Sequence, residues 1–170
     1  MNKKVYLIRH GESEANVALD LDNPNFYYDA KLTSYGKKQA QDTQKKLKNV
    51  DFDLVLCSPL TRALQTFSLI FPNLPQEAVL LPFVREHSLC SSEVGRQPSI
   101  LAKEFPDFNF DNLKDFWWNN NIRIDEKKII FESMEDLDKR VLIFKEWIFK
   151  RSEKKIALVS HGTFISRIIN

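Results

Sequence analysis

The sequence predicts an α/β protein, a three-layer α/β/α sandwich around a mostly parallel sheet. Two observations carry this prediction. First, short apolar runs, typical of buried strands, alternate along the chain with segments whose apolar residues recur at helical spacing. Second, the first run, Lys4–Ile8, and the last, Lys155–Val159, each lead into a His-Gly corner. If the two strands are neighbours in one sheet, both corners lie at the same edge.

Length and composition suit a single domain over residues 1–170, with enough apolar residues for a full core. The net charge of +2 argues against a dedicated nucleic-acid or membrane binder, so we expect neither partner. No leading apolar segment is long enough for a signal peptide, and Cys57 and Cys90 are too few for a disulfide framework. We therefore expect a soluble, cytoplasmic protein with free thiols, and we leave open whether it forms a homo-oligomer.

The segment after the first corner predicts a loop and then a helix. Residues 12–30 are polar, and Asn23–Asn25 signals a turn within them. Thr33 is a good N-cap for the helix that follows. Because Gly36 and Ala40 are small, we expect this helix to approach the sheet closely.

Two further apolar runs follow in the first half of the chain. Residues 53–57 are expected to form the second strand, and residues 60–70 a helix with Arg62 in its first turn. A third run over residues 79–84 is interrupted by Pro82, which cannot donate a ladder hydrogen bond.

Regular patterning weakens over residues 88–130, which we interpret as a cap segment packed over the crevice at the strand ends. The helical pattern resumes after Ser133, a second good N-cap. A stripe of apolar residues then faces the sheet. It consists of Met134, Leu137, Val141, Phe144 and Ile148. After the last strand, residues 163–170 begin a final helix.

The two corners also carry the candidate chemistry. Arg9 and His10 follow the first strand, His161 follows the last, and Arg62 opens a helix directly after another strand. Open α/β sheets bind their ligands outside the carboxyl ends of the strands. Arginine is a natural bidentate partner for phosphate, and helix N-termini add further N–H donors. These four residues therefore predict a pocket for one dianionic group.

A metal site is the competing interpretation of the same crevice. Its ligands would be His10, His161, Glu12 and Glu86. We rank it lower, because two neighbouring arginines would repel a divalent cation and no short ligand spacing is present. We expect no metal and no cofactor.

A cysteine-dependent phosphatase loop is a weaker alternative. Such a loop places five residues between its cysteine and arginine, whereas only four separate Cys57 from Arg62. Pro59 also removes one N–H from the arc. We expect Cys57 to be a buried strand residue.

Five blocks follow one another along nearly the whole chain. They are Arg9-His10-Gly11-Glu12-Ser13 with Asn16; Leu32-Thr33 with Gly36 and Gln39-Ala40; Ser58-Pro59-Leu60 with Arg62-Ala63 and Gln65-Thr66; Arg85-Glu86; and Ser160-His161-Gly162. In this order the blocks resemble the histidine phosphatase superfamily, the phosphoglycerate-mutase-like group. The resemblance implies an α/β three-layer sandwich and catalysis through a phosphohistidine, without a metal.

The resemblance also implies roles for individual residues. His10 resembles the nucleophile and Glu86 the proton donor, while His87 matches no motif and is expected at the surface. The remaining substrate contacts implied are Arg9, Ser13, Asn16, Arg62, His161 and Gly162. We expect Arg9 and Arg62 to lower the pKa of His10, which keeps the imidazole nucleophilic near neutral pH.

The expected activity is hydrolysis of a small phosphorylated substrate, a phosphomonoesterase reaction. The main alternative is a phosphoglycerate mutase, in which a second substrate hydroxyl takes the phosphoryl group. Mutases of this family carry a basic cluster in the cap, and we expect Arg96 and Lys103, after Glu86, to be too few for such a cluster in a region rich in aromatic and acidic residues. A protein that binds phosphorylated ligands without turnover is the least favoured alternative.

Overall fold

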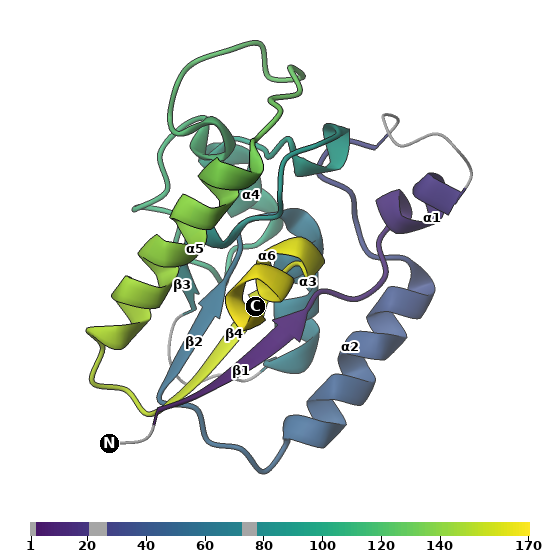
Figure 1. The fold of residues 1–170 in the computed structure, drawn as a ribbon. Helices are drawn as coiled ribbons and strands as arrows, with labels where there is room; N and C mark the ends of the chain where they lie inside the picture. Colours follow the sequence, from purple (N-terminus) through teal and green to yellow (C-terminus); the bar gives the residue numbers. More distant parts are fainter. Residues whose placement is uncertain (1–2, 21–26, 73–77) are drawn as a thin grey trace.

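The computed structural model describes residues 3–20, 27–72 and 78–170, and in these residues a parallel four-stranded sheet forms the centre. Its strands are β1 (Lys4–Arg9), β2 (Leu54–Cys57), β3 (Val79–Leu80) and β4 (Lys155–Ser160), in the order β1-β4-β2-β3 (Figure 1). β1 pairs directly with β4, from Lys4 opposite Lys155 to Arg9 opposite Ser160. The predicted α/β fold and the predicted neighbouring of the first and last strands are both confirmed.

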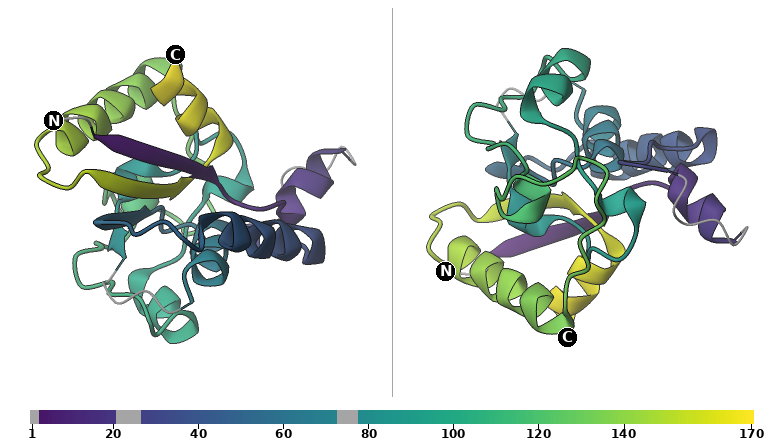
Figure 2. Two further views of the ribbon diagram at one scale, coloured as in Figure 1. Left: turned by 90° about the horizontal axis from the view of Figure 1, so that it is seen from below. Right: turned by 90° about the horizontal axis from the view of Figure 1, so that it is seen from above.

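Helices cover both faces of the sheet, as Figure 2 shows from below and from above. Side chains alternate along β2, so that Leu54 and Leu56 face one layer while Val55 and Cys57 face the other. The first layer consists of α5 (Met134–Phe149) and α6 (Gly162–Ile169). The second consists of α3 (Thr61–Ile70) and aromatic residues of the 88–130 segment. The three-layer arrangement therefore follows from strands that are apolar on both faces.

The helix α2 (Ser34–Leu47) begins where the sequence predicted, because the Thr33 hydroxyl accepts a hydrogen bond from the Gly36 amide at 3.0 Å. Gly36 is buried against the backbone of Gly11 and Glu12. A Cβ at Gly36 would overlap the Glu12 carbonyl oxygen. The close approach made possible by this glycine is thus to the turn after β1, and not to a strand as expected.

The expected loop over residues 12–30 is wrong for one stretch, which forms the short helix α1 (Glu14–Asp20). Ser13 and Asn16 explain its start, because each side chain accepts a hydrogen bond from the other's backbone N–H. A seven-residue helix offers too few turns for a clear apolar period. The predicted turn at Asn23–Asn25 lies outside the described residues.

The third apolar run forms a strand only over its first two residues, Val79 and Leu80. A 3₁₀ helix over Pro82–Val84 follows directly. Pro82 has no N–H for a strand ladder and suits the first turn of a helix, so the strand ends just before it.

The 88–130 segment contains two short 3₁₀ helices, Ser91–Glu93 and Trp117–Asn119, and the helix α4 (Pro98–Glu104). Its large aromatic residues, including Trp117 and Trp118, are buried in the hydrophobic cluster that covers α3 and the sheet. They act as packing residues.

The helix α5 is capped as predicted, because the Ser133 hydroxyl accepts from the Asp136 amide at 3.1 Å. Four of the five residues of the predicted apolar stripe are buried. Met134 is the exception, 45% exposed, since it lies in the first turn before α5 reaches the sheet. No helix in the described ranges combines the length and the apolar character needed to cross a membrane.

The contact of Gly36 with the turn after β1 gives a first prediction. Substituting Gly36→Ala gains about 1 kcal/mol in helix propensity, but the overlap with the Glu12 carbonyl forces the backbone apart. We expect a net loss of about 1–3 kcal/mol in the free energy of unfolding. Denaturant unfolding measures this loss. Gln41→Ala, on the exposed face of the same helix, is the matched control and should change stability by less than about 0.5 kcal/mol. A Gly36→Ala variant as stable as the parent would contradict the packing.

Candidate active site

The site lies at the carboxyl ends of β1 and β4, where the two His-Gly corners meet. His10 follows β1 and His161 follows β4, and their ring centroids are 5.1 Å apart with planes tilted by 57°. The His10 amide donates a hydrogen bond to the Ser160 carbonyl at 3.0 Å, which extends the strand pairing up to the site. The structure thus brings together the two imidazoles that the sequence places almost a whole chain apart.

The hydrogen bonds of His10 fix its tautomer. Nδ1 lies 2.6 Å from the Gly11 carbonyl oxygen, which can only accept, so Nδ1 carries the proton. Nε2 lies 3.2 Å from Nε of Arg62, which can only donate, so Nε2 carries a lone pair. The Gly11 amide in turn donates to the Thr66 hydroxyl at 3.0 Å, which holds the turn against α3.

The environment of His10 keeps its ring neutral. Burial, followed by the charge of Arg62 and then that of Arg9, lowers the pKa of His10 well below its ordinary value of 6.5. The hydrogen bond to Gly11 opposes this effect. Both arginines act in the expected direction, and removal of the ring from water, which did not enter the expectation from the sequence, contributes most.

Arg62 is buried in the first turn of α3, and every nitrogen of its guanidinium has a partner. Besides Nε to His10, Nη1 donates to the Ser92 carbonyl at 2.6 Å and Nη2 lies 3.3 Å from Oε1 of Glu93. Glu93 is itself buried and accepts from the Ser92 hydroxyl. The 3₁₀ helix Ser91–Glu93 therefore holds Arg62 in place from the side opposite the sheet.

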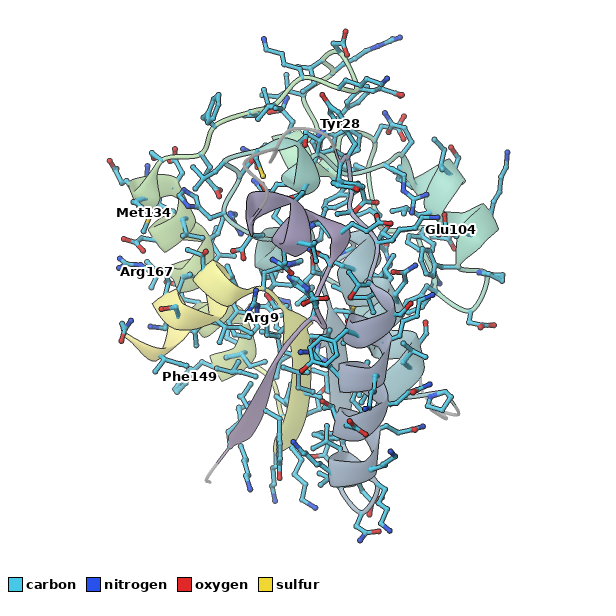
Figure 3. The ribbon with its side chains drawn as sticks, turned by 90° about the vertical axis from the view of Figure 1, so that its right-hand side faces the viewer. Arg9, Tyr28, Glu104, Met134, Phe149 and Arg167 are labelled. Carbon is cyan, nitrogen blue, oxygen red and sulfur yellow. The ribbon has the colours of Figure 1, made fainter. Side chains whose placement is uncertain are left out.

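Arg9 and Asn16 leave donors available at the mouth of the site. Arg9 is exposed at the end of β1, beside α6, where its side chain passes over Gly162 (Figure 3). Its guanidinium has no hydrogen-bond partner within the described ranges. Asn16 uses only its side-chain oxygen, which accepts from the Ser13 amide and hydroxyl at 3.0 Å.

His161 is fully buried, and its Nε2 lies 2.8 Å from the Ser58 hydroxyl. Burial, then Arg62, then His10 and two more distant arginines lower the pKa of His161 well below 6.5. Its Nδ1 is buried without a hydrogen-bond partner in the described part of the chain.

Glu86 lies in the wall of the site at the start of α6. Its carboxylate accepts hydrogen bonds from the backbone amides of Thr163 and Phe164, both at 3.2 Å, and from that of His87 at 2.9 Å. These three contacts fix its orientation. Arg85 forms an ion pair with Glu132 instead, so the pairing of Arg85 with Glu86 that a solvated loop would allow does not occur.

A pocket of about 360 Å³ joins most of these groups, but the fully buried His161 and the adjacent Gly162, both predicted substrate contacts, do not line it. It is lined by Arg9, His10, Ser13, Ala15, Asn16, Arg62, Glu86, His87, Leu89, Cys90, Ser92, Glu93 and Thr163. Its cationic side chains are the two arginines, and its floor is the His10 ring. The pocket can therefore take an anionic group of small size next to the Nε2 lone pair.

Two expectations about individual residues have different outcomes. His87 is buried, with Nε2 2.8 Å from the Glu132 carbonyl, so its expected place at the surface is wrong. Cys57 is fully buried in β2, as expected, and burial raises the pKa of its thiol. Among the described residues, no group of three or more His, Cys, Asp or Glu side chains is arranged to hold a metal ion.

Sequence reasoning did not single out Ser92 and Glu93, the residues that hold Arg62. They belong to no motif, and their contact with Arg62 spans about thirty positions of sequence. The only signal was a carboxylate within a segment already expected to pack over the crevice.

Comparisons with known proteins agree with this geometry. Over residues 5–170 the chain matches the family model of the histidine phosphatase superfamily, branch 1. It is 26% identical to phosphoglycerate mutase-like protein 1 of Arabidopsis thaliana, over 99% of this chain and 71% of that protein. It is 25% identical to a probable phosphatase of Schizosaccharomyces pombe, over 97% of this chain and 76% of that protein.

A solved structure shares the fold at somewhat higher identity. A putative alpha-ribazole-5'-P phosphatase from Escherichia coli superposes with a TM-score of 0.69 at 28% identity, over 98% of this chain and 78% of that one. The family match runs from β1 to α6 and so includes both histidine corners and the sheet that joins them. On this evidence the chain belongs to the histidine phosphatase superfamily.

Proposed function

We propose that the protein is a phosphomonoesterase that hydrolyses a small phosphorylated substrate through a phosphohistidine at His10. The observation that carries the proposal is the orientation of the neutral His10 ring. The Gly11 carbonyl binds Nδ1 and Arg62 contacts Nε2, so the Nε2 lone pair lies at the floor of a pocket of about 360 Å³. A neutral, oriented imidazole beside two arginines is suited to attack phosphorus. Phosphatase-named relatives support the same reaction class.

In the first step Nε2 of His10 attacks the phosphorus, and the bond from phosphorus to the ester oxygen breaks. Arg62 Nε, which donates to Nε2 in the free protein, is then within reach of a phosphoryl oxygen. Arg9 and the side-chain amide of Asn16 can donate hydrogen bonds to the other phosphoryl oxygens. Charge that develops on the transferred group is stabilised in this way, which is the main source of rate in phosphoryl transfer.

In the second step water attacks the phosphorus, the N–P bond breaks, and inorganic phosphate leaves. We assign both proton transfers to Glu86, which lies in the pocket wall with its carboxyl group held at the start of α6. It gives a proton to the leaving alkoxide in the first step and takes one from the attacking water in the second. The protein returns to its starting protonation state.

The mutase alternative requires a basic group that grips a substrate carboxylate, and the candidate residues are otherwise engaged. Arg96 donates to Asp29, Glu104 and the Thr61 hydroxyl. Lys103 lies exposed on α4 and does not line the pocket. These contacts favour water over a second hydroxyl as the phosphoryl acceptor.

Trapping the phosphoenzyme tests the proposal directly. After incubation with a labelled phosphate ester and alkaline quenching, we expect the protein to carry a label that acid removes. His10→Ala should carry no label and hydrolyse no ester, because the nucleophile is gone. Gln41→Ala, on the exposed face of α2 and outside the pocket, leaves His10 intact and should still trap the label. Full activity in His10→Ala, or binding of esters without turnover by the parent protein, would contradict the phosphohistidine mechanism.

The role of Glu86 predicts a dependence on the leaving group. The proposed role requires Glu86 to be protonated in the ester complex; in Glu86→Gln an amide oxygen can still accept from the α6 amides, but no proton can be given. We expect kcat for alkyl phosphates to fall by about 10²–10⁴-fold, and kcat for p-nitrophenyl phosphate, whose leaving group needs no proton, to fall much less. Steady-state rates on both esters give this ratio. An equal loss on both would show that Glu86 only supports the structure.

Because we propose water as the phosphoryl acceptor, a test with phosphoglycerates gives a further prediction. We expect any turnover to release inorganic phosphate at a rate that a bisphosphate primer does not raise, because both arginines that line the pocket of about 360 Å³ are assigned to the phosphoryl group. Product analysis with and without primer measures this. Isomerised phosphoglycerate that appears only with primer would favour the mutase.

A further inference from the structure

His161 has one ring nitrogen with a partner and one without, in a side chain that is fully buried. Nε2 lies 2.8 Å from the Ser58 hydroxyl, while Nδ1 has no hydrogen-bond partner in the described part of the chain. A buried polar atom without a partner is costly, and at a functional site it commonly marks the place of a missing ligand atom. The question is whether Nδ1 offers a proton or a lone pair.

The hydrogen bonds of Ser58 answer it. The Ser58 oxygen already accepts from the Leu60 amide at 3.4 Å, and its hydroxyl proton has no acceptor other than His161 Nε2 within the described residues. If Nε2 carried the ring proton, the Ser58 proton and the Nδ1 lone pair would both be unsatisfied. If Ser58 donates to Nε2, only the Nδ1 proton is unsatisfied. The second arrangement leaves fewer buried groups unpaired.

The charges around His161 favour the neutral form of its ring. Burial, followed by the charge of Arg62 and then those of His10, Arg140 of α5 and Arg9 of β1, lowers the pKa of His161 well below its ordinary value. A protonated ring is therefore disfavoured at neutral pH. The ring reaches the site as a neutral group, whose hydrogen-bonding role depends on which nitrogen holds the single proton.

We propose that Ser58 is a positioning residue, whose hydroxyl donates to Nε2 of His161 and so makes Nδ1–H a neutral donor for an oxygen of the phosphoryl group on His10. The ring centroids lie only 5.1 Å apart, so a phosphoryl group bonded to His10 would lie next to the His161 ring. The identity of the acceptor rests on the proposed function, but the tautomer does not. The Ser58 side chain contacts His161 at 2.8 Å, so we assign it an effect on the substrate that is exerted through that ring.

The tautomer can be measured without any substrate. In protein labelled with ¹⁵N at histidine, the His161 signals should show a protonated Nδ1 and an unprotonated Nε2 at neutral pH. A proton on Nε2 would overturn the proposal at once, whatever the activity of the protein. Inorganic phosphate or vanadate should then shift the Nδ1–H signal, and no shift at saturation would exclude the anion as its acceptor.

Variants at Ser58 test the effect on turnover. Ser58→Ala removes the donor to Nε2, so we expect a mixture of tautomers, a loss in kcat of about tenfold or more and little change in KM. A hydrogen bond accepted by the neutral ring disfavours protonation, so its removal should raise the pKa of His161 and move the acid limb of the kcat profile to higher pH. Ser58→Thr keeps the hydroxyl and should restore the tautomer and the profile.

Two controls separate the outcomes. Ser68→Ala removes a hydroxyl from the exposed side of α3 and should leave kcat, the pH profile and the His161 signals unchanged. Parental kcat and pH profile in Ser58→Ala would overturn the positioning role. If Ser58→Ala does not fold, the tautomer in the parent protein and in Ser58→Thr still decides the matter. Failure to trap a phosphoenzyme in the parent would defeat the proposed function while leaving the measured tautomer as it stands.

Discussion

The parallel pairing of β1 with β4 is the constraint on which the rest of the structure depends. The register that sets Arg9 opposite Ser160 places the next residue of each strand, His10 and His161, at one edge of the sheet. A slip of one position would turn every side chain of a strand to the other face. The site therefore depends on sheet geometry first, and on the loops around it second.

Arg62 links this sheet edge to the segment that covers it. Its guanidinium contacts His10 on the sheet side and Ser92 and Glu93 on the other, all of them buried. A buried arginine with a complete set of partners has a fixed position. A fixed cation is suited to stabilise the negative charge that develops on a phosphoryl group during transfer. Burial of His10 beneath it keeps the imidazole neutral, so packing and charge act together on the same ring.

Much of the fold and part of the site could be predicted because they depend on local signals. Thr33 and Ser133 mark the helix starts through side-chain chemistry that is complete within four residues. The burial of His87 and the contact of Glu93 with Arg62 could not be predicted, since both arise from partners far away in sequence. The helix Glu14–Asp20 was missed because its seven residues are too few to show a helical period. Which of these residues carry out chemistry stays a prediction.

The position of β4 between β1 and β2 has a consequence for how the molecule is made. During synthesis on a ribosome β1 emerges long before its neighbour β4, because the pairing joins Lys4 to Lys155. Pairing over such a separation has a high contact order and is slow to form. Until β4 has been made, β1 and β2 lack the strand that lies between them. The two histidine corners can therefore meet only after that pairing.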